Sequence, residues 1–233
     1  MQTNPTTPRK MDRRTIYTRN TVKDALLELL EEQPFEKITV AALCRQAEIT
    51  RATFYLHFTD INAVLDELLD EALMVAEAAS NNMEISVRMD GLKEVVHSGD
   101  WKKLRTNERL LGPCQRVADD PKYQAIFQDA TLSNYVIRRI YTVERDQMIP
   151  YLMRECHLGR DEADKLFMMI VYGLFYVNRS LKWSKDDNWY KMQFMINCFM
   201  FGGFDTLRNQ QKNNGGALSS THSASLHPGA QRI

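Results

Sequence analysis

Two short helical segments joined by three residues place the strongest constraint on how this chain can fold. Thr39 precedes the first segment and Thr50 precedes the second, and a threonine hydroxyl in that position commonly caps a helix. The connection is Glu48-Ile49-Thr50. The apolar side chains recur at helical spacing, at Leu43, Ala47, Ile49, Phe54 and Phe58. These proportions predict a helix-turn-helix unit over residues 39–58, although an ordinary helical hairpin would have the same spacing.

The rest of the chain has helical rather than strand periodicity. A first helix is expected over residues 15–32, because its apolar side chains share one face and Pro34 prevents continuation. A fourth helix follows Asp60, which can cap it. Three long helices are predicted farther along, over residues 132–155 with a kink at Pro150, 161–181 and 187–207. We therefore expect an all-α fold.

The chain is expected to have four parts. Residues 1–12 are polar and basic and are expected to form a disordered arm. Residues 13–60 form the helix-turn-helix domain, and residues 61–209 form a larger C-terminal helical domain. Residues 210–233 are rich in asparagine, glycine, serine and histidine, with almost no apolar surface to bury, so we expect a disordered tail.

Several features favour a cytoplasmic protein. The first fourteen residues lack the apolar core of a signal peptide. The longest apolar run, residues 166–177, is shorter than the ~20 residues that span a bilayer. The 4 cysteines are far apart and form no CxxC pair, which argues against a disulfide framework and a zinc site. We expect no metal, no cofactor and no membrane partner.

Charge is distributed unevenly along the chain. The formal net charge is +0, which by itself argues against a nucleic-acid partner. Residues 9–23 nevertheless carry repeated arginines and lysines against a single acid, Asp12, whereas residues 52–87 contain acids but no lysine or arginine. The basic segment suits phosphate and the acidic segment does not.

The outward positions of the second short helix are the ones available to DNA, because that helix enters the major groove in a unit of this kind. Arg51 can form two hydrogen bonds with a guanine edge, and Ala52 or Thr53 can contact a thymine methyl group. The neighbouring phenol, imidazole and capping hydroxyls can donate to phosphate oxygens. The candidate DNA-contacting residues are Arg14, Lys37, Thr39, Arg45, Thr50, Arg51, Ala52, Thr53, Tyr55 and His57.

The same residues resemble the DNA-binding domain of the TetR family. The run over residues 39–60 carries the likeness, above all Thr53-Phe54-Tyr55 followed by His57-Phe58, and the likeness extends over roughly residues 13–75. The resemblance implies a transcriptional regulator, most simply a repressor, that binds a palindromic double-stranded DNA operator as a homodimer. It also implies release from DNA by a small-molecule effector in the C-terminal domain.

Two positions depart from the family pattern. Glu48 stands in the turn where many members have glycine, so a left-handed backbone there would add strain of about 1 kcal/mol. Ile61 stands where members tend to carry a lysine that reaches phosphate. The N-terminal arm, Lys37 and Arg45 must therefore supply most of the positive charge.

The last two predicted helices are apolar around most of their circumference. Such helices need cover on more than one side, and a second copy of the chain is a natural cover. Methionine and aromatic side chains also suit a permissive ligand cavity. The candidate effector-binding residues are Met168, Met169, Tyr172, Phe175 and Tyr176.

Two other classes of function are weighed against this interpretation. A protein-interaction module or co-regulator on the same scaffold, with little DNA binding of its own, would suit the scarcity of positive charge after Arg51. An enzyme is disfavoured because the chain contains no GxGxxG, GxxxxGK[ST], HExxH or GxSxG motif, so no catalytic residue is assigned.

Overall fold

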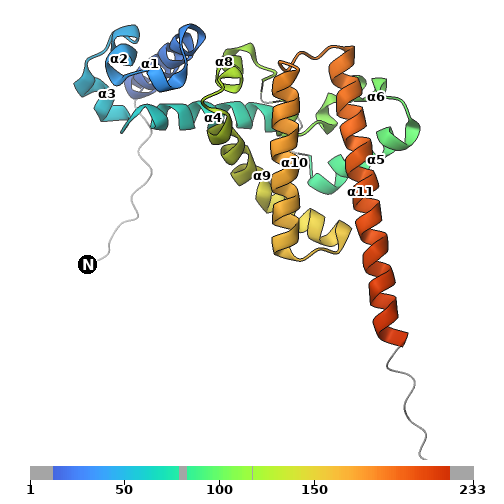
Figure 1. Cartoon of the computed structure of the whole chain (residues 1–233). Helices are drawn as coiled ribbons and strands as arrows, with labels where there is room; N and C mark the ends of the chain where they lie inside the picture. The colour runs from blue at the N-terminus through green and yellow to red at the C-terminus, as the bar shows by residue number, and fades with distance from the viewer. Residues whose placement is uncertain (1–12, 79–82, 117, 221–233) are drawn as a thin grey trace, which may run out of the picture. The chain divides into compact units, whose positions relative to one another are not determined.

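The computed structural model describes residues 13–78, 83–116 and 118–220, and these ranges contain α-helices and short 3-10 helices but no β-strand (Figure 1). The expected all-α fold is therefore confirmed. No helix within the described residues is long and apolar enough to cross a membrane. The predicted basic arm, residues 1–12, and the last part of the predicted tail, residues 221–233, lie outside the described residues.

The chain folds into two compact units. The first unit contains Met1–Ala79 and Pro113–Ile140, and the second contains Ser80–Gly112 and Tyr141–Ile233. Each unit is thus built from two separate stretches of sequence.

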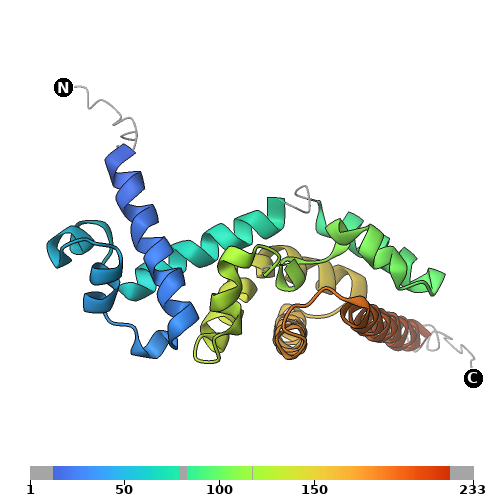
Figure 2. The ribbon, with the colours of Figure 1, turned by 90° about the horizontal axis from the view of Figure 1, so that it is seen from above.

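Four helices form the core of the first unit: α1 (Arg13–Glu32), α2 (Val40–Gln46), α3 (Arg51–His57) and α4 (Ile61–Ala78). Figure 2 shows α1 crossing α4, with α2 and α3 on one side of α1. The sequence boundary at residue 60 falls just before α4, but α4 packs with the helices that precede it. The fully buried side chains explain this packing, since they come from all four helices: Val22, Leu26, Leu43, Phe54, Val64, Leu65, Leu68 and Leu69.

Shorter elements complete the first unit. They are η1 (Phe35–Lys37), α7 (Pro113–Arg116), η3 (Pro121–Tyr123) and α8 (Gln124–Gln128), followed by the beginning of α9 (Ser133–Cys156). The backbone N–H of Phe35 donates to Asp129 Oδ2 at 2.7 Å, and α1 packs against α8. The segment that leads into α2 is therefore fastened to α8.

The acidic face of α4 is neutralised from two sides within the first unit. Ion pairs and a hydrogen bond connect it to α1 and α9: Arg19–Glu67, Lys23–Glu71, Arg139–Asp70 and Tyr135–Asp66. Burial, together with the hydrogen bond to Asp66, raises the pKa of Tyr135 to about 12, so the phenol stays neutral and keeps donating. The carboxylates of α4 thus hold neighbouring helices in place.

The second unit contains the remaining helices. They are α5 (Ile85–Ser98), α6 (Lys102–Thr106) with η2 (Glu108–Leu110), the end of α9, α10 (Arg160–Ser180) and α11 (Asp187–Ser220). Helices α5 and α6 both pack against α11. A buried amide joins α10 to α11, because Asn178 Oδ1 accepts from Trp189 Nε1 at 2.8 Å and from Gln193 Nε2 at 3.0 Å.

The predicted helix limits hold for α9 and α10 within a residue or two, and α9 continues through Pro150. The end of α11 was predicted wrongly. Its helix runs to Ser220, beyond Leu207 and into the segment expected to be disordered. The apolar periodicity stops near Leu207, but no proline occurs before Pro228 to terminate the backbone hydrogen bonds.

Two of the cysteines described by the structure are protonated thiols in the core. Cys44 and Cys156 are buried and, with Cys198, are free thiols. Burial raises the pKa of the Cys44 thiol and raises that of Cys156 to about 11, so both remain protonated near neutral pH. Among the described residues no group of three or more histidine, cysteine or acidic side chains is placed to hold a metal ion.

Candidate nucleic-acid interface

Both short helices begin at the threonines that the sequence assigns as caps. Thr39 Oγ1 accepts from the backbone N–H of Ala42 at 3.1 Å, and Thr50 Oγ1 accepts from that of Thr53 at 3.1 Å. The backbone conformation of both threonines is extended, as a cap requires. These hydroxyls therefore fix the start of α2 and α3, and both threonines remain exposed at the surface.

The inner face of the helix-turn-helix agrees with its prediction. Leu43, Ala47, Phe54 and Phe58 are buried, and Ile49 is half-buried. The rings of Phe54 and Phe58 lie 5.9 Å apart at their centroids. Phe54 lies on α3 and Phe58 is the residue that caps its C-terminal end, so this aromatic pair fixes which side of the helix turns outward.

The outer face of α3 carries the predicted contact residues. Arg51, Ala52 and Tyr55 are exposed, whereas Thr53 and His57 are half-buried. Sequence reasoning missed Leu56, which is 82% exposed. The signal was available, because position 56 is two residues from both inward phenylalanines and so lies on the opposite side of a helix with 3.6 residues per turn.

The turn between α2 and α3 has the left-handed backbone that the family pattern suggests. Glu48 has φ 52°, its N–H donates to Arg45 O at 3.2 Å, and the N–H of Ile49 donates to Cys44 O at 2.9 Å. A glutamate in this region is strained, since its Cβ crowds the backbone.

Replacing Glu48 with glycine is expected to raise the free energy of unfolding by about 1 kcal/mol, because glycine adopts a positive φ without that crowding. The midpoint of urea denaturation followed by hydrogen exchange of α2 and α3 would measure this. Glu36→Gly is the matched control, since Glu36 is exposed in η1 and has no positive φ. There the added backbone freedom of the unfolded chain should lower stability. A loss of stability in both variants would contradict strain at Glu48.

Arg19 joins three elements of the first unit. Its Nη1 donates to the carbonyl oxygen of His57 at 2.6 Å, and its guanidinium lies 4.3 Å from the centroid of the Phe58 ring. The same group forms an ion pair with Glu67. Arg19 therefore positions the end of α3 against α1 and α4, and its charge is directed inward rather than toward phosphate.

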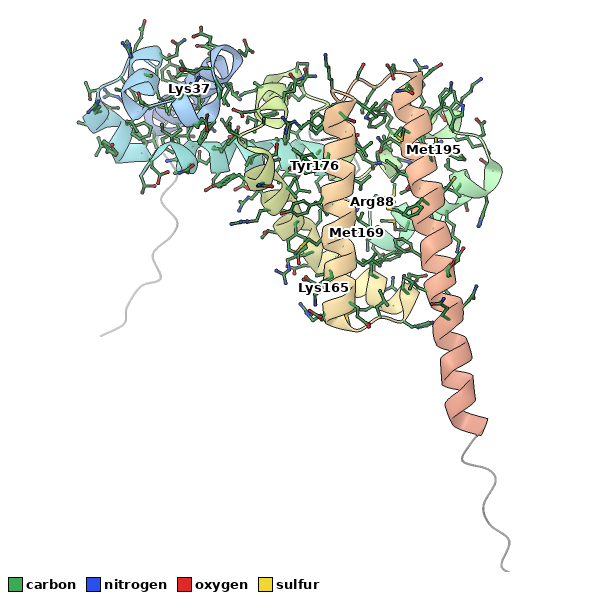
Figure 3. All side chains as sticks on the ribbon, in the orientation of Figure 1. Lys37, Arg88, Lys165, Met169, Tyr176 and Met195 are labelled. Atoms are coloured by element: carbon green, nitrogen blue, oxygen red, sulfur yellow. The ribbon has the colours of Figure 1, made fainter. Side chains whose placement is uncertain are left out.

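The remaining basic residues divide between the interior and the surface. Lys23 is buried against α4, whereas Arg14, Lys37, Arg45 and Arg51 are exposed (Lys37 is labelled in Figure 3). The DNA contacts expected of these four exposed residues stay predictions. Ile61, in the position of the family lysine, is half-buried on α4.

The predicted effector residues do not gather around one enclosed cavity. Phe175 is buried against Trp183, whereas Met168, Met169, Tyr172 and Tyr176 are exposed on the outer side of α10. A shallow apolar groove of about 260 Å³ separates α10 from α11, and of the five predicted residues only Met169 lines it. Figure 3 labels Met169 and Tyr176 on α10 and Met195 on α11.

Comparison with known proteins finds a family match in the N-terminal part of the chain. Residues 22–68 match the family described as bacterial regulatory proteins, tetR family. The chain therefore contains a domain of the tetR type over these residues. The matched residues contain the two capped helices, the turn at Glu48 and the beginning of α4, so the tetR match and the observed helix-turn-helix coincide.

Two individual proteins are similar to this chain. The uncharacterized HTH-type transcriptional regulator YxbF of Bacillus subtilis (strain 168) is 32% identical over 65 residues, which are 28% of this chain and 17% of that protein. The chain thus matches less than a fifth of the length of that relative. The crystal structure of the TetR family repressor AlkX from Dietzia sp. strain DQ12-45-1b has 16% identity and a TM-score of 0.36, covering 81% of this chain and 95% of that one.

Proposed function

We propose that this chain is a sequence-specific DNA-binding transcriptional regulator, acting as a repressor that binds a palindromic operator as a homodimer. The tetR-type domain with an exposed face on α3 carries the proposal. Thr50 caps α3 directly before Arg51. In the proposed complex α3 is the recognition helix, and this cap fixes the position of the N-terminal residues that would contact base edges.

Selection from a random pool of DNA duplexes with the purified chain, followed by affinity measurements across a salt series, tests the proposal. We expect enrichment of an inverted repeat and an affinity that falls steeply with salt, because Lys and Arg displace counterions from phosphate. Failure to enrich any sequence would contradict operator recognition.

Two substitutions on α3 should separate base reading from phosphate binding. Arg51→Ala is expected to cost roughly 1–3 kcal/mol on the selected operator and to relax discrimination at one base pair. Tyr55→Ala should weaken binding to all sequences alike, since a phosphate contact carries no sequence information. Competition assays with single-base operator variants distinguish the two patterns. Identical specificity profiles for Arg51→Ala and the wild type would contradict the base contact.

The homodimer is supported by the outer faces of α10 and α11. Large apolar side chains are exposed there: Met168, Met169, Tyr172 and Tyr176 on α10, with Met195 and Phe199 on α11. An apolar surface of this kind marks an interaction site in a globular protein. We further propose that a small-molecule effector bound in the C-terminal region releases the DNA, by binding the two dimer geometries with different affinity.

A protein-interaction module is the second candidate function. The exposed apolar side chains of the first unit favour it, namely Ile16, Tyr17, Tyr55 and Leu56, together with the absence of lysine and arginine from residues 52–87. Absence of duplex binding even at low salt, combined with loss of a specific protein partner on Leu56→Asp substitution, would favour this function over operator binding.

A further inference from the structure

Leu56 is the most exposed large apolar side chain among the described residues of the first unit. It lies on α3, the recognition helix of the proposed complex, and is 82% exposed. Ala52, one helical turn earlier on the same face, is exposed as well. Neither side chain has a group that can form a hydrogen bond. The outer face of α3 therefore carries an apolar strip, formed by Ala52 and Leu56, that no other described element covers.

The surroundings of the apolar strip do not suit phosphate. Residues 52–59 contain no lysine, arginine or acidic residue. Thr53 is half-buried, and its hydroxyl lies 2.9 Å from that of Thr50, so this hydroxyl is already engaged at the start of the helix. Of the two residues expected to meet a thymine methyl group, Ala52 is thus the more accessible one, and Leu56 extends its apolar surface along α3.

The major groove of DNA offers this strip one kind of apolar partner at the base edges. The C5-methyl group of thymine projects into the groove, whereas most of the other groups that distinguish the bases there are hydrogen-bond donors or acceptors. Leucine packed against such a group would displace its water without replacing the hydrogen bond. Leucine packed against a methyl group buries apolar surface on both partners. Contact with thymine is therefore the favourable arrangement for Leu56.

We propose that Leu56 recognises the C5-methyl group of a thymine in each half-site of the operator. The inference rests on the proposed function, because it names a base that the helix-turn-helix selects. Ala52 and Leu56 are separated by about 6 Å along the helix axis, or roughly two base-pair steps of ~3.4 Å. The recognised thymine thus lies within about two base pairs of the base pair that Ala52 faces.

Replacement of single thymines by deoxyuridine in the selected operator tests the contact, because it removes the methyl group and keeps every hydrogen-bonding group of the base. For one thymine of each half-site, the wild-type affinity should fall roughly fourfold, the effect of one buried methyl group. Leu56→Ala should bind the thymine and deoxyuridine duplexes equally tightly. Met74→Ala is the matched control, since Met74 is 71% exposed but lies on α4, and it should respond as the wild type does.

Leu56→Met provides a second variant, because methionine is apolar and has a similar volume. It should keep the preference for thymine over deoxyuridine at the same position, and circular dichroism would verify the fold of each variant. The same loss of affinity in the wild type and Leu56→Ala at every thymine would overturn the proposal, since Leu56 would then contact a sugar or a protein. Failure to select any operator would overturn the proposed function as well, so the two failures are distinguishable.

Discussion

Replacement of Phe54 by alanine is expected to destabilise the first unit by about 3–5 kcal/mol, the largest effect of any single substitution considered for this chain. The Phe54 side chain has no exposed surface and lies on α3 within a core shared by α1, α2 and α4. Its removal leaves a cavity and also weakens the ring contact with Phe58, over which Arg19 is placed. The recognition helix would lose both its packing and its orientation.

Spectroscopy can assign this loss to one unit. Trp101, Trp183 and Trp189 are the three tryptophans of the chain, and all belong to the second unit. In the Phe54→Ala variant, hydrogen exchange of α1 to α3 should therefore show unfolding at a lower urea concentration than in the wild type. The midpoint of the transition followed by tryptophan fluorescence should shift less. Leu56→Ala is the matched control, since Leu56 lies on the same helix with 82% exposure and should change stability by less than about 0.5 kcal/mol. Equal destabilisation by the two substitutions would mean that the inner face of α3 is assigned wrongly.

The helix-turn-helix could be predicted from the sequence because its signals are local. Thr39 and Thr50 cap helices that begin at the next residue, and Phe54 and Phe58 are one helical turn apart. The positive φ at Glu48 was suggested only by the resemblance, because many family members have glycine in this turn. Capping and periodicity act over a few residues, so a single sequence contains them.

Interactions between distant segments could not be predicted in the same way. Arg19 and Lys23 belong to a basic segment that suits phosphate, yet they pair with Glu67 and Glu71, more than forty residues away. The periodicity of residues 85–98 likewise places Arg88 on an apolar face but does not identify Glu144 as its neighbour. A run of basic residues in a sequence predicts a positively charged surface only if those residues have no acidic partners elsewhere in the fold.

The sequence also could not predict what covers the apolar surface of the last two helices. Sequence periodicity correctly indicated that α10 and α11 have more apolar surface than one neighbour can cover, since Met169 is 58% exposed and Phe199 is 78% exposed. It could not decide between a ligand cavity and a partner subunit, because both need the same side chains. The observed exposure on an outer face favours the partner subunit.

Phe199→Asp is expected to raise the dissociation constant of the proposed homodimer by roughly 100-fold. Phe199 is the most exposed aromatic side chain of α11 and lines the groove together with Gly173 and Met200. Truncation of an aromatic anchor commonly costs about 2 kcal/mol or more at an interface. An aspartate adds the cost of burying an unpaired carboxylate.

Sedimentation equilibrium across a concentration series would measure the dissociation constant. Asn188→Asp introduces the same charge at an exposed position near the start of α11, where it should leave the dissociation constant unchanged. Unchanged tryptophan fluorescence would show that the second unit stays folded in both variants. A wild-type chain that is monomeric at micromolar concentration would contradict the dimer itself, whereas equal constants for the two variants would move the interface away from Phe199. Since a palindromic operator requires two recognition helices in one complex, Phe199→Asp should also convert tight operator binding into weak binding of single half-sites.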